Sequence, residues 1–252
     1  MTPQGELLTS IRVGDAFGSM LLDLLHDPAG GHVEILERED GNIQPGMGPL
    51  YFSSSDAWGR LDNAACDMVT GRILDIGAGA GRHSLHLQSR GLEVTALDVS
   101  PGAITVCQER GVRDARLGTV PALVDAQRDR FDTFLLLGGN VGLLSSPSAA
   151  PALFGALRTL ASPGARIITG GPDPYLTDNP AHLNYHELNR RRGRPAGQTT
   201  IRVRYRDLST PWFDYWLLAP DELAAVAGAN GWRLTSADRD GRQYLAVLGL
   251  AG

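Results

Sequence analysis

One stretch of nine residues decides the fold of this 252-residue chain: Ile73-Leu74-Asp75-Ile76-Gly77-Ala78-Gly79-Ala80-Gly81. An apolar run with an embedded acid leads into three alternating glycines. Small residues let the backbone pass close beneath a ligand, and the helix predicted to follow offers its N-terminal N–H groups. A dinucleotide-binding loop would read Gly-x-Gly-x-x-Gly, whereas here the third glycine comes one residue early and Arg82 follows it. The spacing therefore disfavours NAD.

Apolar strands and helical stretches alternate outward from this motif, as in βαβ units around a buried parallel sheet. Strands are predicted at 72–76, 93–97, 115–117, 131–137 and 166–169. Helices are predicted near 82–90, 101–110, 151–161 and 220–230. A closing antiparallel hairpin is expected at 233–236 and 244–248, around the turn at Asp240-Gly241. The expected fold class is α/β, doubly wound and Rossmann-like.

Two segments flank or interrupt this pattern. Residues 1–70 are expected to form a helical cap within the same domain, and residues 71–252 to form the main domain with an inserted, β-containing lid at about 170–219. In the cap, we predict a helix over 13–26, a short strand within 32–38 and a helix capped by Ser55 or Asp56. In the lid, the alternating residues 199–206 predict a strand.

Composition excludes several classes of function. All 23 basic residues are arginine, so lysine Schiff-base chemistry and a P-loop lysine are ruled out. Cys66 and Cys107 lack the spacing of a zinc site, and the acids form no recognisable metal-ligand set. The net charge of −5 provides no field to attract nucleic acid. The sequence has no membrane-length apolar run and no export signal, so we expect a cytoplasmic protein, and its composition suggests a bacterial gene.

The nine-residue motif resembles the first motif of the class I S-adenosylmethionine-dependent methyltransferases, an acidic residue followed by Gly-x-Gly-x-Gly. The resemblance covers roughly residues 71–248, because five βα units followed by a strand hairpin are that family's order within a seven-stranded sheet. Asp98 closes the second predicted strand, where the family places a carboxylate that accepts hydrogen bonds from both ribose hydroxyls. The resemblance implies S-adenosyl-L-methionine as the cofactor.

The same resemblance implies a set of cofactor-binding residues. They are Asp75, Gly77, Ala78, Gly79, Gly81, Arg82, Asp98, Val99, Thr119, Leu137, Gly138 and Asn140. Val99 would cover one face of the adenine, and Thr119 stands where the family often has an acid or amide for the adenine amino group. Backbone carbonyls near Leu137 and the Asn140 side chain would face the methionine portion. Asp75 could equally be a structural cap on the glycine turn.

The acceptor is expected to be a small molecule. The fourth strand ends in Leu137-Gly138-Gly139-Asn140, not in the Asn/Asp-Pro-Pro-aromatic pattern of enzymes that methylate nucleobases or glutamine. We therefore expect direct in-line methyl transfer to a bacterial secondary metabolite, by a monomer or homodimer, aided by alignment and exclusion of water. Alternatives are a same-fold enzyme that uses the cofactor for another reaction, a non-catalytic cofactor-binding module and, less favoured, an RNA methyltransferase.

The lid and cap supply candidates for chemistry on the acceptor. His186 is the preferred general base because histidine titrates near neutrality, with Asp173 and Tyr185 as lesser candidates. Aromatic side chains could wall the acceptor pocket: Tyr51, Trp58, Tyr175, Trp212 and Tyr215. The alternative interpretation is that the histidine is a solvated or capped side chain and that at least half of the aromatic cluster is ordinary core. The arginine-rich run 190–194 is interpreted as a solvated helix end beside glycine; the alternative is a site for an anionic substrate group or RNA.

Overall fold

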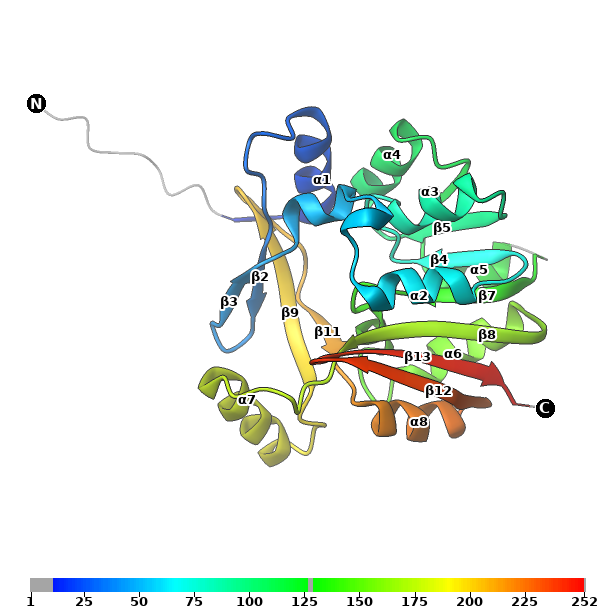
Figure 1. The fold of residues 1–252 in the computed structure, drawn as a ribbon. Helices are drawn as coiled ribbons and strands as arrows, with labels where there is room; N and C mark the ends of the chain where they lie inside the picture. The colour runs from blue at the N-terminus through cyan, green and yellow to red at the C-terminus, as the bar shows by residue number, and fades with distance from the viewer. Residues whose placement is uncertain (1–10, 127–128, 252) are drawn as a thin grey trace, which may run out of the picture.

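The structure of the protein is a computed structural model that describes residues 11–126 and 129–251. These residues form two sheets, which Figure 1 shows beside each other with helices packed around them. We name the seven-stranded sheet the core sheet and the six-stranded sheet the lid sheet. Within the described ranges no helix is both long and apolar enough to cross a membrane, and no group of three or more side chains could hold a metal ion.

The core sheet has the spatial order β6-β5-β4-β7-β8-β13-β12. Its strands are β4 (Ile73–Ile76), β5 (Val94–Asp98), β6 (Asp114–Leu117), β7 (Phe131–Leu136), β8 (Ala161–Pro172), β12 (Trp232–Asp240) and β13 (Gln243–Leu250). The first five are parallel, while β13 runs antiparallel to both β8 and β12. This arrangement confirms the predicted doubly wound, Rossmann-like α/β fold.

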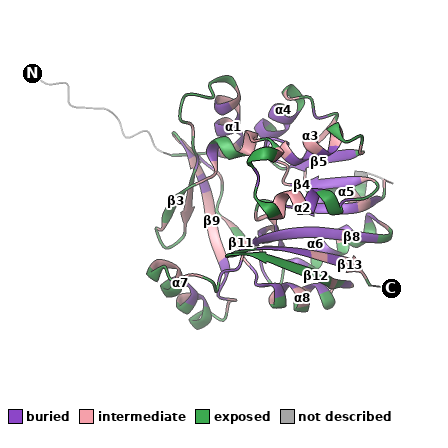
Figure 2. Cartoon of the chain, in the orientation of Figure 1, coloured by how far each residue is buried: buried purple, intermediate pink, exposed green. Residues whose placement is uncertain are grey.

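The central strands of the core sheet, β4, β5 and β7, are largely apolar and buried because both faces of the sheet are covered there. Successive residues alternate between two clusters: Leu74 and Phe134 face one, and Ile73 and Leu135 face the other. The first face packs on α5 (Val120–Ala126), α6 (Ala150–Thr159) and α8 (Pro220–Gly228); the second packs on α2 (Arg60–Met68) and α3 (Arg82–Ser89). Figure 2 shows the resulting band of buried residues along β4, β5 and β8.

Several predicted boundaries differ from the structure, and the strand predicted at 166–169 extends over Ala161–Pro172. The helix predicted to end at Ala161 stops at Thr159. The reason is that the Leu160 carbonyl accepts a hydrogen bond from the Phe131 N–H and that Ala161, the first residue of β8, pairs with Phe131 of β7. The helix expected to be capped by Ser55 or Asp56 begins instead at Arg60 with Gly59 as its N-cap. Trp58 has an extended backbone, and its ring N–H donates to the Ser53 carbonyl, which turns the chain before the helix.

The lid sheet joins two segments that are far apart in the sequence. From the first seventy residues come β1 (Arg12–Val13), β2 (Ile35–Arg38) and β3 (Ile43–Pro45); from the region after β8 come β9 (Gln198–Tyr205), β10 (Leu208–Ser209) and β11 (Phe213–Trp216). β9 lies at the centre, with β2 on one edge and β10 and β11 on the other. The strands predicted within 32–38 and 199–206 are thus confirmed and pair with each other.

Two helices accompany the lid sheet. α1 (Ala16–His26) lies against α4 (Pro101–Glu109), and a Cβ added at Gly102 would fall 2.6 Å from the Cα of Gly18. Glycine at both positions therefore lets the two backbones touch. α7 (Pro180–Arg191), which the sequence analysis did not predict, lies at the opposite end of β9 in Figure 1. Its last turn carries Arg190 and Arg191, the first two residues of the arginine-rich run. The run continues past the end of the helix through Gly193, which has φ of 70°.

Candidate functional site

A cavity of about 710 Å³ lies between the carboxyl ends of the core-sheet strands and the lid sheet. Such a volume is in the range of sites for small molecules and cofactors. Its core-sheet wall includes Asp75, Gly77, Ala78, Gly79, Arg82, His83, Asp98, Val99, Thr119, Leu137, Gly138 and Asn140. Its lid wall includes Phe17, Leu36, Pro45, Met47, Tyr51, Ile201, Val203, Phe213 and Tyr215. Open α/β sheets bind ligands at this edge.

The glycine loop, residues 77–81, forms the floor of the cavity. Gly77, Gly79 and Gly81 all have positive φ angles, of 71°, 56° and 73°, a backbone conformation that other residues rarely adopt. A Cβ added at Gly79 would point into the cavity toward Phe17 and Tyr51, at 3.6 and 3.9 Å. The loop thus leaves a cradle at Gly79 that any side chain would fill.

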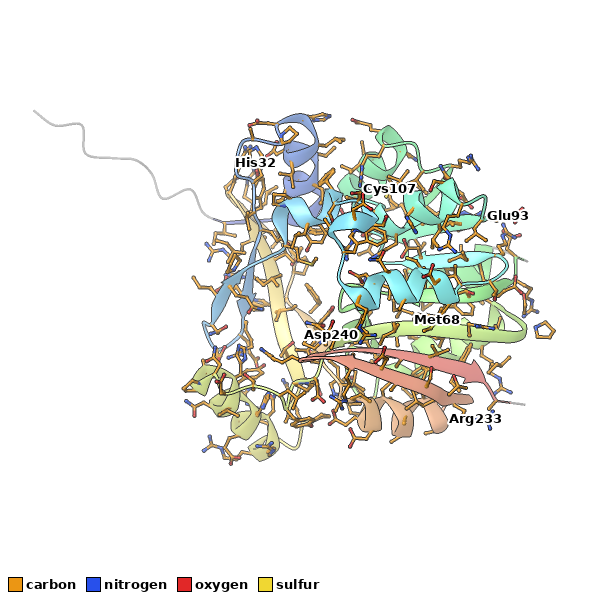
Figure 3. The ribbon with its side chains drawn as sticks, in the orientation of Figure 1. His32, Met68, Glu93, Cys107, Arg233 and Asp240 are labelled. Atoms are coloured by element: carbon orange, nitrogen blue, oxygen red, sulfur yellow. The ribbon has the colours of Figure 1, made fainter. Side chains whose placement is uncertain are left out.

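Gly81 has a different role from its two neighbours in the motif. It does not line the cavity, and a Cβ there would lie 2.9 Å from Val112 Cγ2 and 3.0 Å from Cys107 Sγ. Cys107, which is labelled in Figure 3, comes from α4. Gly81 therefore allows α3 to pack closely against its neighbours. The resemblance implied a cofactor-binding role for Gly81, but the residue lies outside the cavity lining.

Asp98 holds the loop to the end of β5. Its Oδ2 accepts the Gly79 N–H and its Oδ1 accepts the Ser100 N–H, both at 2.9 Å. Burial raises the pKa of Asp98, and the two N–H donors only partly offset that effect. Each carboxylate oxygen has a second lone pair, so the side chain can still accept two hydrogen bonds at the cavity wall.

Two polar side chains brace the loop as well as lining the cavity. Ser84 Oγ donates to Asp75 Oδ2 at 2.7 Å, which ties β4 to the first turn of α3. Asn140 Nδ2 donates to the carbonyls of Ile76 and Gly77, each at 2.9 Å. The amide hydrogens of Asn140 are thus used within the protein, and its Oδ1 is the atom that can serve a ligand.

Arg82 lines the cavity from the first turn of α3. Its Nη2 donates to Asp62 Oδ2 at 3.1 Å, and its guanidinium lies 5.3 Å from the Trp58 ring centroid. Burial acts to raise the pKa of Asp62, but hydrogen bonds and charge from His83 and Arg82 outweigh it and lower that pKa. Trp58, expected to wall the acceptor pocket, does not line the cavity; it packs beneath Arg82 and His83.

Val99 and Thr119 line the far end of the cavity. Val99 directly follows β5 and is 67% exposed, so one face of its apolar side chain is open to the cavity. Thr119 Oγ1 accepts the Ala122 N–H at 3.3 Å at the start of α5. Its hydroxyl can therefore donate to a ligand or accept through its second lone pair.

The lid wall is mostly apolar, with two tyrosine hydroxyls. Tyr51 Oη donates to Glu34 Oε1 at 2.7 Å, and Tyr215 Oη donates to the Gly139 carbonyl at 2.5 Å. Burial raises the pKa of both phenols, and the Glu34 charge raises that of Tyr51 further. The sequence analysis missed most of this wall, namely Phe17, Leu36, Pro45, Met47, Ile201 and Val203. The alternation in β9 was the available signal for Ile201 and Val203.

The three candidate general bases do not line the cavity. His186, on α7, packs against Tyr175, and burial lowers the pKa of this histidine. Asp173 accepts hydrogen bonds from Arg239 Nη1 and the Tyr175 N–H, at 2.9 and 3.0 Å. Tyr185 Oη donates to Glu39 Oε1 at 3.0 Å. Tyr185 and His186 thus join α7 to its surroundings, whereas Asp173 pairs with Arg239 at the end of β12.

Two aromatic candidates for the acceptor pocket also lie elsewhere. Tyr175 donates its hydroxyl to Glu222 Oε1 at 2.6 Å, and Trp212 packs under the guanidinium of Arg202, 4.6 Å from its ring centroid. Both rings are more than two-fifths exposed. Of the five aromatic residues predicted to contact the acceptor, Tyr51 and Tyr215 are the two that line the cavity.

Comparisons with known proteins point to one family. A family model described as a methyltransferase domain matches residues 73–164. A ubiquinone biosynthesis O-methyltransferase of Azorhizobium caulinodans is 46% identical over 71 residues, 26% of this chain and 28% of that protein. The match thus spans less than a third of that relative's length.

Solved structures extend the similarity to the whole fold. An S-adenosylmethionine-dependent methyltransferase of Bacteroides fragilis, in complex with S-adenosyl-L-homocysteine, has a TM-score of 0.79 and 28% identity over 94% of this chain and 95% of its own. The CcbJ methyltransferase of Streptomyces caelestis has a TM-score of 0.58 and 16% identity over 79% of this chain and 99% of its own. At that identity the second similarity shows the fold alone.

Proposed function

We propose that this chain is a class I S-adenosylmethionine-dependent methyltransferase that transfers a methyl group from S-adenosyl-L-methionine to a small molecule. The single observation that carries the proposal is the cradle at Gly79 beside the buried Asp98 carboxylate, open to a cavity with room for more than one ligand. When bound, the cofactor supplies an electrophilic methyl group on a positively charged sulfur.

The residues present fit this cofactor. We propose that Asp98 accepts hydrogen bonds from the two ribose hydroxyls with its remaining lone pairs. Val99 and Thr119 would border the adenine, and Gly77, Gly79 and Leu137 the amino acid portion. Asp75 and Asn140 brace the loop and offer oxygen atoms to cationic groups, while Arg82 can pair with a carboxylate.

The chain's contribution to catalysis would be alignment and exclusion of water. The lid sheet covers the carboxyl ends of the core strands, and its wall presents mostly apolar side chains to the cavity. We propose that the segment 1–70 and the insertion at about 170–219 act together as this lid, since β2 pairs with β9 over four residues. An acceptor held there would approach the methyl group in line.

A small-molecule acceptor is favoured by the enclosed site and by the acidic net charge of −5. The curated relative is an O-methyltransferase of ubiquinone biosynthesis, which makes a hydroxyl acceptor a suitable first choice. We propose an acceptor from secondary metabolism; the cytoplasmic location and the state of monomer or homodimer remain predictions. A non-methylating enzyme of this fold, a non-catalytic cofactor-binding module and an RNA methyltransferase are the competing hypotheses.

Two measurements test the proposal. Calorimetry with S-adenosyl-L-homocysteine should give one site per chain, and undetectable binding would contradict the cofactor assignment. Purified protein should then transfer label from methyl-labelled cofactor into the small-molecule fraction of a bacterial metabolite extract. Binding without transfer would favour a non-catalytic module or a non-methylating reaction, and transfer to RNA with strong salt dependence would favour a nucleic-acid substrate.

A further inference from the structure

The charges that line the cavity all lie on its core-sheet wall. The ionisable side chains other than tyrosine in that lining are Asp75, Arg82, His83 and Asp98. The lid wall carries none, so a charged acceptor would lose its hydration there without gaining an ionic partner. This distribution favours an uncharged, largely apolar acceptor. The inference rests on the proposed methyltransferase function and concerns how such an acceptor would lose its proton.

The two tyrosines of the lid wall are both committed as hydrogen-bond donors. A phenol has one hydrogen, which Tyr51 donates to Glu34 Oε1 and Tyr215 donates to the Gly139 carbonyl. Each oxygen can therefore only accept a hydrogen bond from a ligand in the cavity. Their geometry selects an acceptor molecule that donates one, such as an un-ionised hydroxyl group.

The groups behind the two tyrosines differ in what they can receive. Behind Tyr215 stands a backbone carbonyl, which does not take a proton. Behind Tyr51 stands Glu34, whose exposed fraction is 0%. Its carboxylate accepts the Met47 N–H at 3.1 Å and the Gly48 N–H at 3.4 Å, and it takes part in none of the ion pairs found among the described residues. Glu34 is therefore a buried carboxylate with no cationic partner in the ranges 11–126 and 129–251.

The chain around Glu34 is shaped to hold that carboxylate. A Cβ added at Gly46 would lie 1.9 Å from Glu34 Oε1, so only glycine leaves room for the oxygen. Tyr51 is fixed from its other side, where Phe17 packs edge-on at a centroid distance of 5.3 Å. The ring of Tyr51 also lies above the Gly79 cradle. The hydroxyl that can pass on a proton is thus on a ring beside the place proposed for the cofactor.

We propose that Tyr51 is the catalytic residue that receives the acceptor's proton and that Glu34 acts through it as the final proton acceptor. The acceptor oxygen forms the new bond to the methyl carbon, and the methyl–sulfur bond breaks with its electron pair left on sulfur. At the same time the acceptor's proton moves to Tyr51 Oη, and the proton of Tyr51 moves to Glu34 Oε1. The positive sulfur and the negative carboxylate both become neutral, which a low-dielectric site favours. The reverse relay returns the proton to water after product release.

The test uses 2-naphthol as an uncharged, apolar hydroxyl probe. This molecule becomes a much stronger acid when excited and then gives its proton to water as well as to a protein group, so the loss of anionic emission from the bound molecule in a variant reports the missing proton acceptor. The full-length protein is first saturated with S-adenosyl-L-homocysteine, and 2-naphthol binding is measured by calorimetry. Bound 2-naphthol is then excited beyond the absorption of tryptophan. We expect binding and anionic emission from the wild-type complex.

Variants separate the relay from a structural role. Glu34→Gln keeps the shape of the side chain and an oxygen that accepts the Tyr51 hydrogen bond. This variant should lose the anionic emission, while its affinities for S-adenosyl-L-homocysteine and for 2-naphthol stay unchanged. Tyr51→Phe should abolish the emission as well. Tyr215→Phe is the matched control, because it removes the same hydroxyl from the same wall without a carboxylate behind it, and the emission should persist.

The outcomes are distinct. If S-adenosyl-L-homocysteine does not bind, the proposed function fails. Three results would overturn the relay and leave the cofactor assignment standing once S-adenosyl-L-homocysteine binds. In the first, 2-naphthol does not bind; in the second, bound 2-naphthol emits only as the neutral molecule; in the third, its anionic emission is the same in Glu34→Gln as in the wild type. Circular dichroism and the affinity for S-adenosyl-L-homocysteine show whether each variant is folded.

Discussion

The two walls of the cavity are built by different means. The core-sheet wall is made largely of main-chain groups and short side chains, fixed by positive-φ glycines and by carboxylates that accept backbone N–H groups. The lid wall is made of large apolar side chains from α1, β2 and β9, with two tyrosines held by partners behind them. A substitution in the core-sheet wall would therefore disturb the backbone that holds it, whereas a substitution in the lid wall would mainly change the shape of the cavity.

The largest expected effect is on the glycine loop. Gly79→Val would place a branched side chain in the cradle and force it into a left-handed backbone, so we expect affinity for S-adenosyl-L-homocysteine to fall at least about 100-fold. Calorimetry measures it. Gly91→Val is the matched control, since Gly91 has φ of 82° with nothing within 4 Å of an added Cβ. It should lose stability from the same strain and keep its affinity; equal losses of affinity would show that the cradle is not the site.

A smaller effect is expected at the ribose position. Asp98→Ala removes the proposed charge-assisted hydrogen bonds, which should weaken nucleoside binding by about 1.5–3 kcal/mol, or roughly 10- to 150-fold. The control Asp114→Ala removes a carboxylate from the neighbouring strand, where it binds Thr95 Oγ1 and Arg116 outside the cavity. Unaltered affinity in the Asp98 variant would refute the assignment.

The joint between the two walls can be loosened separately. Asp15 caps α1 by accepting the Gly18 N–H at 2.9 Å, and it also accepts the Ser100 hydroxyl and the Gly102 N–H, each at 2.8 Å. Asp15→Ala should lower the free energy of unfolding by about 1–2 kcal/mol, measured by chemical denaturation. Asp27→Ala, at the exposed opposite end of α1, should change it much less. Equal stability of both variants would mean that α1 is not anchored through this residue.

The smallest effect on the site is expected from α7. His186 lies outside the cavity, so His186→Ala should leave nucleoside affinity and methyl transfer unchanged while costing about 1 kcal/mol of stability through lost packing. Parallel assays of transfer and of urea unfolding check this. If the variant lost methyl transfer but kept its affinity and stability, His186 would again be a candidate general base.

The sequence predicted the two walls with unequal success, for a physical reason. Backbone geometry at a glycine loop and a carboxylate at a strand end are local requirements, so the residues around Asp75 and Asp98 could be named from a short motif and the family resemblance that it carries. The pairing of β2 with β9 links residues more than 160 positions apart, and no local pattern encodes it. Glu34 was missed because a single acid before a short strand looks like any surface residue until the turn at Gly46 buries it.

The same limit explains the misplaced general bases. A dense run of titratable groups between 173 and 187 suggested chemistry, but those side chains serve α7 and its neighbours. Residues of an acceptor site converge from many elements, so their clustering in space does not require clustering in sequence. The two tyrosines that do line the lid wall come from segments 164 positions apart.

The most direct test of the central claim is a crystal structure with S-adenosyl-L-homocysteine bound. The account predicts density for the nucleoside in the cavity, with both ribose hydroxyls within hydrogen-bond distance of the Asp98 carboxylate and the amino acid portion over Gly77 and Gly79. Density for the nucleoside at any other place, or a ribose turned away from Asp98, would contradict it.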